Sequence, residues 1–290
     1  MSDSQTAQRA RRALLVMPGP GLVRAARAAG LEVWAALDHT LEVERDLRSE
    51  LPPERILRVD FADAAELRAV LTDTARHHGI GHILYLPGAL TGGASAAAES
   101  VARELAEDRE GAAGGLPDAV AMRRVLNASG ISAVRAEEAA TVAEARALAE
   151  AFPLPVVIKS ADGTGVWHTA LVRDHEALTD WAGRAVAGRY PGPHLVEELL
   201  TGPQFSVETF SVDGMHLVAG ITAEGHAEPL SDEDRAGVRA VVRALLDLAG
   251  YESGTTRTDV LITARGSRIA ASREPYGKPG TAAEGNGNGA

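Results

Sequence analysis

The chain has 290 residues, enough for two domains, and 45% of them are apolar, which is ordinary for a protein with a buried core. Its formal net charge of −11 argues against a nucleic-acid partner, because phosphate backbones are held by clustered positive charge. Cysteine is absent, which excludes disulfides and thiolate metal sites, and no stretch approaches the ~18 apolar residues of a membrane span. We therefore expect a cytoplasmic protein with no membrane partner.

The first third of the chain alternates short apolar runs with helix-like segments. Strands are expected at 13–17, 31–37, 55–61 and 82–88, and a helix at 64–78. Such alternation predicts a parallel sheet with helices on its faces. The Pro-Gly-Pro-Gly turn after the first strand lacks the full G-x-G-x-x-G spacing, so a plain sheet turn is favoured over a dinucleotide site.

The best domain boundary is the Glu-Gly-Ala-Ala-Gly-Gly stretch that follows the next helix. We expect a Rossmann-like domain over 1–114 and a second domain over 115–279. The second domain is expected to divide into a lid subdomain at about 118–192 and a carboxy-terminal subdomain at about 193–279. The low-complexity tail at 280–290 is predicted to be disordered.

Within the second domain the pattern changes from strand–helix alternation to hairpins and isolated helices. Along one strand Gln204, Ser206 and Glu208 alternate with Phe205 and Val207, which predicts one polar and one core-facing wall. The other expected elements are a helix between Asp118 and Gly130, helices at 142–152 and 175–188, a strand at 194–200, a hairpin turn at 212–214, a helix at 232–249 and closing strands at 256–263 and 267–275.

The stretch at 155–172 reads as an apolar strand that carries Lys159, followed by a glycine-rich turn at 162–165 and a second strand. Such a turn can direct backbone N–H groups toward phosphate oxygens. Only Lys159 and Lys278 are lysines among the 29 basic residues, which indicates a site that needs a compact ammonium rather than a guanidinium. A nucleotide-phosphate clamp and a lysine that reaches solvent from a sheet edge both stay open.

The segment from Asp118 to Pro275 resembles the ATP-grasp superfamily, particularly the carboxylate–amine ligases that join amino acids. Six motifs carry the resemblance in order: DxxAMRxxLxxxGI, VVIKxADGTG, VEExLxGPxxSVExFSVDG, GITAE, GxxxTDV and RIxxxxEP. The resemblance implies an α/β (α+β) protein, in which a small Rossmann-like parallel-sheet domain precedes an ATP-grasp fold.

The resemblance also implies a set of nucleotide-binding residues. Lys159 would contact the phosphates, and Gln204 stands where the family usually has a glutamate on the ribose hydroxyls. The remaining nucleotide contacts would come from a lid turn and a hinge that meets the adenine: Asp162, Gly163, Thr164 and Gly165 in the turn, and Glu197, Glu198 and Leu199 in the hinge.

The implied magnesium site departs from the family pattern. Asp259 and Glu274 would hold Mg²⁺ together with phosphate oxygens and water. Arg257 and Lys159 are the candidate catalytic residues, and Arg257 begins the segment that corresponds to the family's HTEV. Ser272 replaces a family glutamate. Tyr276 stands where the family has an arginine that would steady an acyl phosphate.

The function implied is an ATP-dependent carboxylate–amine ligase with ATP and Mg²⁺ as cofactors. A substrate carboxylate would attack the γ-phosphorus, and an amine would capture the acyl phosphate to form an amide or peptide bond. Small-molecule carboxylates and amines, such as amino acids, are the expected partners, and a homodimer stays open. No Ser-His-Asp or Cys-His set stands out in the sequence, and phosphoryl transfer needs no side-chain nucleophile.

Two other readings stay open. A relative that binds nucleotide or a partner protein without turnover is favoured by Arg257, Ser272 and Tyr276, because such losses weaken charge stabilisation. A dehydrogenase built on the first domain is the third reading. For His168 in the lid and His226 nearby, packing or solvation is favoured over a substrate contact.

Overall fold

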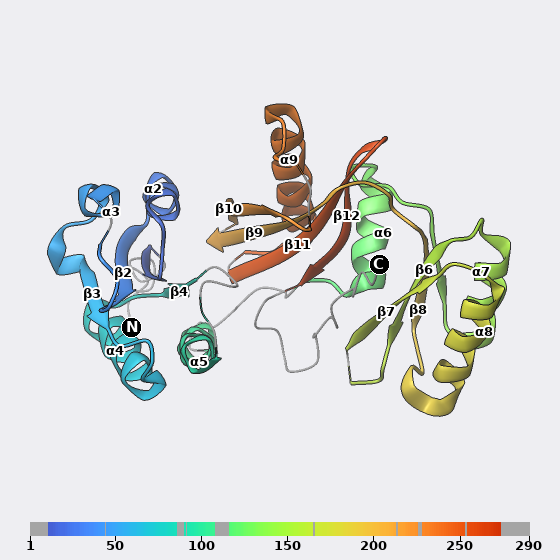
Figure 1. Cartoon of the computed structure of the whole chain (residues 1–290), viewed down its shortest axis with the longest axis horizontal. Coiled ribbons are helices and arrows are strands. Elements are labelled where there is room, and N and C mark those ends of the chain that lie inside the picture. The colour runs from blue at the N-terminus through green and yellow to red at the C-terminus, as the bar shows by residue number, and fades with distance from the viewer. Residues whose placement is uncertain are drawn as a thin grey trace.

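Figure 1 shows the computed structural model of the chain, with three four-stranded sheets that follow one another along its long axis. The structure describes residues 11–43, 45–85, 90, 92–107, 116–164, 166–212, 214–225, 228–252 and 254–273.

The amino-terminal sheet is parallel, in the order β3-β2-β1-β4. Side chains of β1 alternate between its two faces, so Ala13 and Leu15 pack under α2 and α3 while Leu14 and Val16 pack under α4 and α5. The predicted strand–helix alternation and parallel sheet are confirmed. The elements are β1 (Arg12–Val16), α2 (Pro20–Ala28), β2 (Glu32–Asp38), α3 (Arg45–Glu50), a 3-10 turn (Pro53–Arg55), β3 (Ile56–Val59), α4 (Ala64–His78), β4 (His82–Leu84) and α5 (Gly92–Glu107).

The central sheet is antiparallel, in the order β10-β9-β11-β12, and α9 covers one of its faces. Val207 and Val260 pack against Val242 and Leu245 of that helix. The opposite face carries the predicted polar wall, and farther along β9 it meets the amino-terminal core through Phe210. The elements are β9 (Gln204–Val212), β10 (Met215–Ala223), α9 (Asp232–Leu248), β11 (Gly254–Thr263) and β12 (Gly266–Arg273).

The third sheet is antiparallel, in the order β5-β8-β6-β7, and α7 and α8 pack on it. Strand β8 follows the boundary expected at residue 193, yet it pairs with β5 and β6 rather than with the central sheet. The change of sheet therefore comes after β8. The elements are α6 (Ala119–Ser129), β5 (Ala136–Ala139), α7 (Val142–Ala151), β6 (Val156–Ala161), β7 (Trp167–Val172), α8 (His175–Arg184), a π turn (Ala185–Arg189) and β8 (His194–Glu198).

No helix within the described ranges is long and apolar enough to cross a membrane.

The turn between β8 and β9 depends on a glycine. Gly202 has a φ of 143°, and a Cβ at this position would overlap the carbonyl oxygen of Ile262. We expect Gly202→Ala to lower the free energy of unfolding by about 2 to 4 kcal/mol, because backbone strain and steric overlap add. Urea denaturation would measure the loss. Gly183→Ala is the control, since an added Cβ there would meet nothing within 4 Å beyond its own helix backbone, and alanine favours the helix. Equal stability of the two variants would contradict the prediction.

Candidate functional site

Lys159 belongs to a buried ionic cluster where the third sheet meets the central one. Its Nζ lies 2.6 Å from Glu197 Oε2 on the neighbouring strand β8 and donates to the Ala270 carbonyl of β12, also at 2.6 Å. Arg123 of α6 donates to Glu197 Oε1 at 2.5 Å and to the Ile269 carbonyl at 2.9 Å. Exposure is 7% for Lys159, 4% for Glu197 and 2% for Arg123. One carboxylate therefore serves two buried cations.

The electrostatic balance of the cluster keeps Glu197 ionised. Burial by itself would raise the pKa of its carboxyl, but the charges and hydrogen bonds of Lys159 and Arg123 outweigh burial and hold that pKa below its usual range. Ala270, whose carbonyl Lys159 contacts, directly precedes Ala271, and Ala271 pairs with Asp259 of β11. The cluster thus brings the predicted phosphate lysine to the strand that lies beside the predicted metal ligand.

The sequence interpretation missed Arg123. Its neighbours Val120, Met122 and Leu126 form the buried stripe of α6, and Arg123 lies within that stripe. A charged residue on an otherwise apolar helix face is the signal that could have indicated a buried partner.

The turn at 162–164 is organised by its own aspartate. Asp162 Oδ1 accepts hydrogen bonds from the Thr164 hydroxyl at 2.7 Å, the Thr164 N–H at 2.9 Å and the Val166 N–H at 3.2 Å, while Oδ2 lies 3.1 Å from His168 Nε2. The bonds from Thr164 and His168 hold the pKa of Asp162 well below its usual range. Gly163 has a φ of 83°. Asp162 therefore shapes the loop, and Gly165 lies outside the described residues.

The predicted hinge residues point in different directions. Glu197 enters the buried cluster, whereas Glu198 accepts from Arg265 at 2.5 Å and from the Arg135 N–H at 2.9 Å. Burial opposes ionisation of Glu198, but these hydrogen bonds prevail and lower its pKa. Leu199 follows the end of β8 and is partly exposed. Only Glu197 of this trio meets Lys159.

A connected row of polar side chains crosses the open face of the central sheet. Glu224 accepts from Gln204 at 2.9 Å and from Arg257 at 3.2 Å. Arg257 Nε lies 3.9 Å from Asp259 Oδ1, and Arg273 donates to Asp259 Oδ2 at 2.8 Å. The structure therefore brings together Gln204, Arg257 and Asp259. Glu224 and Arg273 complete the row, and the sequence interpretation had assigned no role to either.

The described residues do not by themselves fit a magnesium site. Asp259 already faces two guanidinium groups, although its Oδ1 is buried and accepts no hydrogen bond from the described residues. Across the described ranges, no group of three histidine, aspartate or glutamate residues could hold a metal ion. Glu274, the second predicted ligand, lies outside those ranges. A carboxylate neutralised by arginines has little net charge left for a cation.

A Ser–His–Asp arrangement lies at the β9–β10 hairpin. Ser211 Oγ is 2.7 Å from His216 Nδ1, and His216 Nε2 is 3.3 Å from Asp247 Oδ1. Ser211 has no exposed surface, so a substrate could not reach its hydroxyl. Burial also holds the pKa of His216 below its usual value. The arrangement is a packing contact between the hairpin and α9.

Comparison with known proteins places this geometry in context. Residues 118–208 match the family described as the ATP-binding domain of the carbamoyl-phosphate synthase L chain. Over 154 residues the chain is 29% identical to the uncharacterized protein y4rH of Sinorhizobium fredii, an alignment that covers 48% of this chain and 32% of that protein.

Two solved structures align with most of the chain. A biotin carboxylase–β-γ-ATP complex from Campylobacter jejuni aligns with a TM-score of 0.50 and 13% identity, over 90% of this chain and 64% of that one. An L-amino acid ligase from Bacillus licheniformis aligns with a TM-score of 0.47 and 18% identity, over 91% and 66%. The chain thus spans about a third of the curated relative and under two thirds of the biotin carboxylase. The predicted resemblance to the ATP-grasp superfamily is confirmed, and the chain has the ATP-grasp fold.

Proposed function

We propose that the chain is an ATP-dependent carboxylate–amine ligase that forms an amide or peptide bond through an acyl phosphate. The supporting observation is the buried Lys159 ammonium, which lies inside the segment that matches an ATP-binding family and is held between Glu197 and the Ala270 carbonyl. These two contacts use two of the three N–H groups of the ammonium and leave the third for a phosphate oxygen.

In this proposal the nucleotide lies between the third sheet and the open face of the central sheet. Lys159 receives the phosphates, the turn at 162–164 covers them, the segment 197–199 meets the adenine, and Gln204 hydrogen-bonds the ribose. Arg257 and Arg273 lie on the open face, where guanidinium groups can stabilise charge on a transferring phosphoryl group.

The proposed reaction has two steps. A carboxylate oxygen of the first substrate bonds to the γ-phosphorus, and the bond from that phosphorus to the β–γ bridging oxygen breaks to release ADP. The nitrogen of an amine then bonds to the acyl carbon, phosphate leaves with its oxygen, and the amine gives up a proton. Positioning and charge stabilisation supply the catalysis, so no protein nucleophile is needed. ATP and a carboxylate–amine pair are the proposed ligands. The proposed location of the protein is the cytoplasm.

An ADP-release assay across pairs of amino acids tests this proposal. Mass spectrometry should find a product whose mass is the sum of the two substrates less one water. Nucleotide binding without ADP release for any pair would contradict the ligase proposal and favour a chain that kept only nucleotide binding. Stabilisation by NADH but not by ATP would instead favour a dehydrogenase. Magnesium, implied by the resemblance through Asp259 and Glu274, is titrated in the same assay.

The arginines beside Asp259 make a separate prediction for metal-free binding. We expect Asp259→Asn to tighten ADP binding in EDTA by about two- to fivefold, because Arg257 and Arg273 lose the carboxylate that partly neutralises them. Calorimetric titration measures the change. Glu138→Gln, which removes the same charge from the exposed pair with Arg124, should leave ADP affinity unchanged. If Asp259→Asn instead left metal-free binding unaltered and raised the Mg²⁺ requirement more than tenfold, Asp259 would be a metal ligand.

A further inference from the structure

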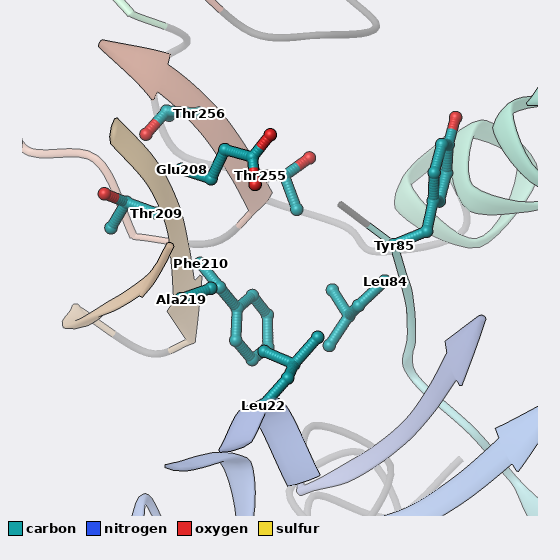
Figure 2. A pocket seen from close by; sticks show the side chains of 9 residues that line it. All are labelled: Leu22, Leu84, Tyr85, Glu208, Thr209, Phe210, Ala219, Thr255 and Thr256. Atoms are coloured by element: carbon teal, nitrogen blue, oxygen red, sulfur yellow. The ribbon is translucent and has the colours of Figure 1, made fainter. Parts of the chain in front are cut away.

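A small hollow lies between the amino-terminal sheet and the central sheet, away from the Lys159 cluster (Figure 2). It is small, with about 20 Å³ open to the centre of a water molecule, and it is partly open to solvent. Leu22 of α2, Leu84 of β4 and Phe210 of β9 form its apolar wall, and each is at most 7% exposed. Figure 2 shows Glu208 and Thr255 on the opposite side of the hollow.

Glu208 is the single charged residue among the described residues that line this hollow. Its carboxylate is half-buried, and no hydrogen bond or ion pair to it is found within the described ranges. Its register partner Arg257 carries an opposite charge that acts on it, but Arg257 is already engaged by Glu224 and Asp259. Burial raises the pKa of Glu208, and the charge of Arg257 only partly opposes this. A half-buried carboxylate without a dedicated partner among the described residues, at the edge of a hollow, is a candidate ligand-binding group.

The neighbouring strand leaves room for this carboxylate. Gly220 of β10 is the register partner of Glu208, and a Cβ on Gly220 would lie 3.3 Å from Glu208 Oε2. That separation is tighter than an ordinary van der Waals contact. The glycine therefore allows the glutamate to lie flat over β10 beside the hollow.

We propose that the hollow binds a small primary amine, with its ammonium on Glu208 and its apolar part against Leu22, Leu84 and Phe210. A cation would offset the cost of the buried carboxylate, and the same carboxylate would repel an anionic ligand. The short apolar wall limits the hydrocarbon part to a few carbons. That this amine is the nucleophile of bond formation rests on the proposed function, whereas amine binding itself does not.

The site is tested by titrating the protein, without nucleotide, with three ligands of similar shape and different charge. Saturation-transfer NMR measures the affinity of each ligand. We expect 2-methylpropylamine to bind the wild-type chain, and 2-methylpropan-1-ol and 2-methylpropanoate to bind at least tenfold more weakly. Glu208→Gln should weaken amine binding at least tenfold and leave binding of the alcohol unchanged. Glu137→Gln, which removes an exposed carboxylate from β5, is the matched control and should bind the amine as the wild type does.

Two results would overturn the proposal. One is equal amine binding by wild type and Glu208→Gln, and the other is tighter binding of 2-methylpropanoate than of the amine. Gly220→Ala is a second variant in case Glu208→Gln does not fold, and it should also weaken amine binding because the carboxylate must shift. Amine binding without ADP release for any substrate pair would support the site and contradict the ligase. ADP release that is indifferent to Glu208→Gln would support the ligase and contradict the assignment of this amine as its nucleophile.

Discussion

Replacing Glu197 by glutamine is expected to lower the free energy of unfolding by about 3 to 5 kcal/mol. The change leaves the Lys159 ammonium and the Arg123 guanidinium buried side by side without the carboxylate that joins them. Breaking a buried ion pair from one side costs this much because the remaining charge is neither solvated nor paired. Guanidinium denaturation measures the loss, and an unchanged denaturant slope would show that the folded state keeps its compactness.

Companion variants separate charge imbalance from loss of packing. Lys159→Met should destabilise the protein much less, because it leaves the single balanced pair of Arg123 and Glu197. The double variant Glu197→Gln/Lys159→Met should recover part of the loss, since it removes one of the two uncompensated cations. Glu198→Gln is the control, because it removes a carboxylate from a partly exposed pair with Arg265 and should cost about 1 kcal/mol or less. If Glu197→Gln lowered the free energy of unfolding no more than Glu198→Gln, the prediction that the buried cluster stabilises the fold would be wrong.

The second large effect is expected on ADP release. Lys159→Met should lower the rate about 10² to 10³-fold, because it removes a fixed positive charge from the proposed phosphate site. Lys159→Arg should fail similarly, since the ammonium fits between Glu197 and the Ala270 carbonyl and a planar guanidinium does not replace it.

Folded protein is needed for this comparison, so rates are measured only below the unfolding transition of each variant. Arg265→Met removes an exposed cation from the same region and should keep the rate within threefold of wild type. A Lys159→Met rate within tenfold of wild type would show that this lysine only ties the sheets together.

Much of the fold was predictable because it depends on local pattern. The alternation of apolar runs with helices gave the parallel sheet, and the alternation of Gln204 and Glu208 with Val207 gave the two walls of β9. The hairpin between β9 and β10 follows from its turn residues. What the pattern did not reveal is that β8 pairs with β6, because antiparallel pairing between distant segments leaves no local periodicity.

The site was less predictable because it depends on side chains from separate elements. The resemblance indicated Lys159 and Glu197, but the contact of Glu197 with Arg123 joins residues 74 positions apart. The register between β11 and β12 shifts after Asp259, which disturbs the alternation of side chains between the two faces. The pairing of Arg273 with Arg257 could therefore not be predicted from the sequence. The hollow beside Glu208 arises where two sheets meet, which no single motif encodes.

The buried cluster also has a mechanical consequence. Lys159 and Arg123 bind the carbonyls of Ala270 and Ile269, consecutive residues of β12, and the Ile269 N–H donates to Ser132 Oγ at 2.8 Å. The third sheet and α6 are thus held to two consecutive residues of β12. A movement of the third sheet that preserves these bonds is therefore a rotation about Ile269 and Ala270. In such a rotation the turn at 162–164 moves while Lys159 keeps its place.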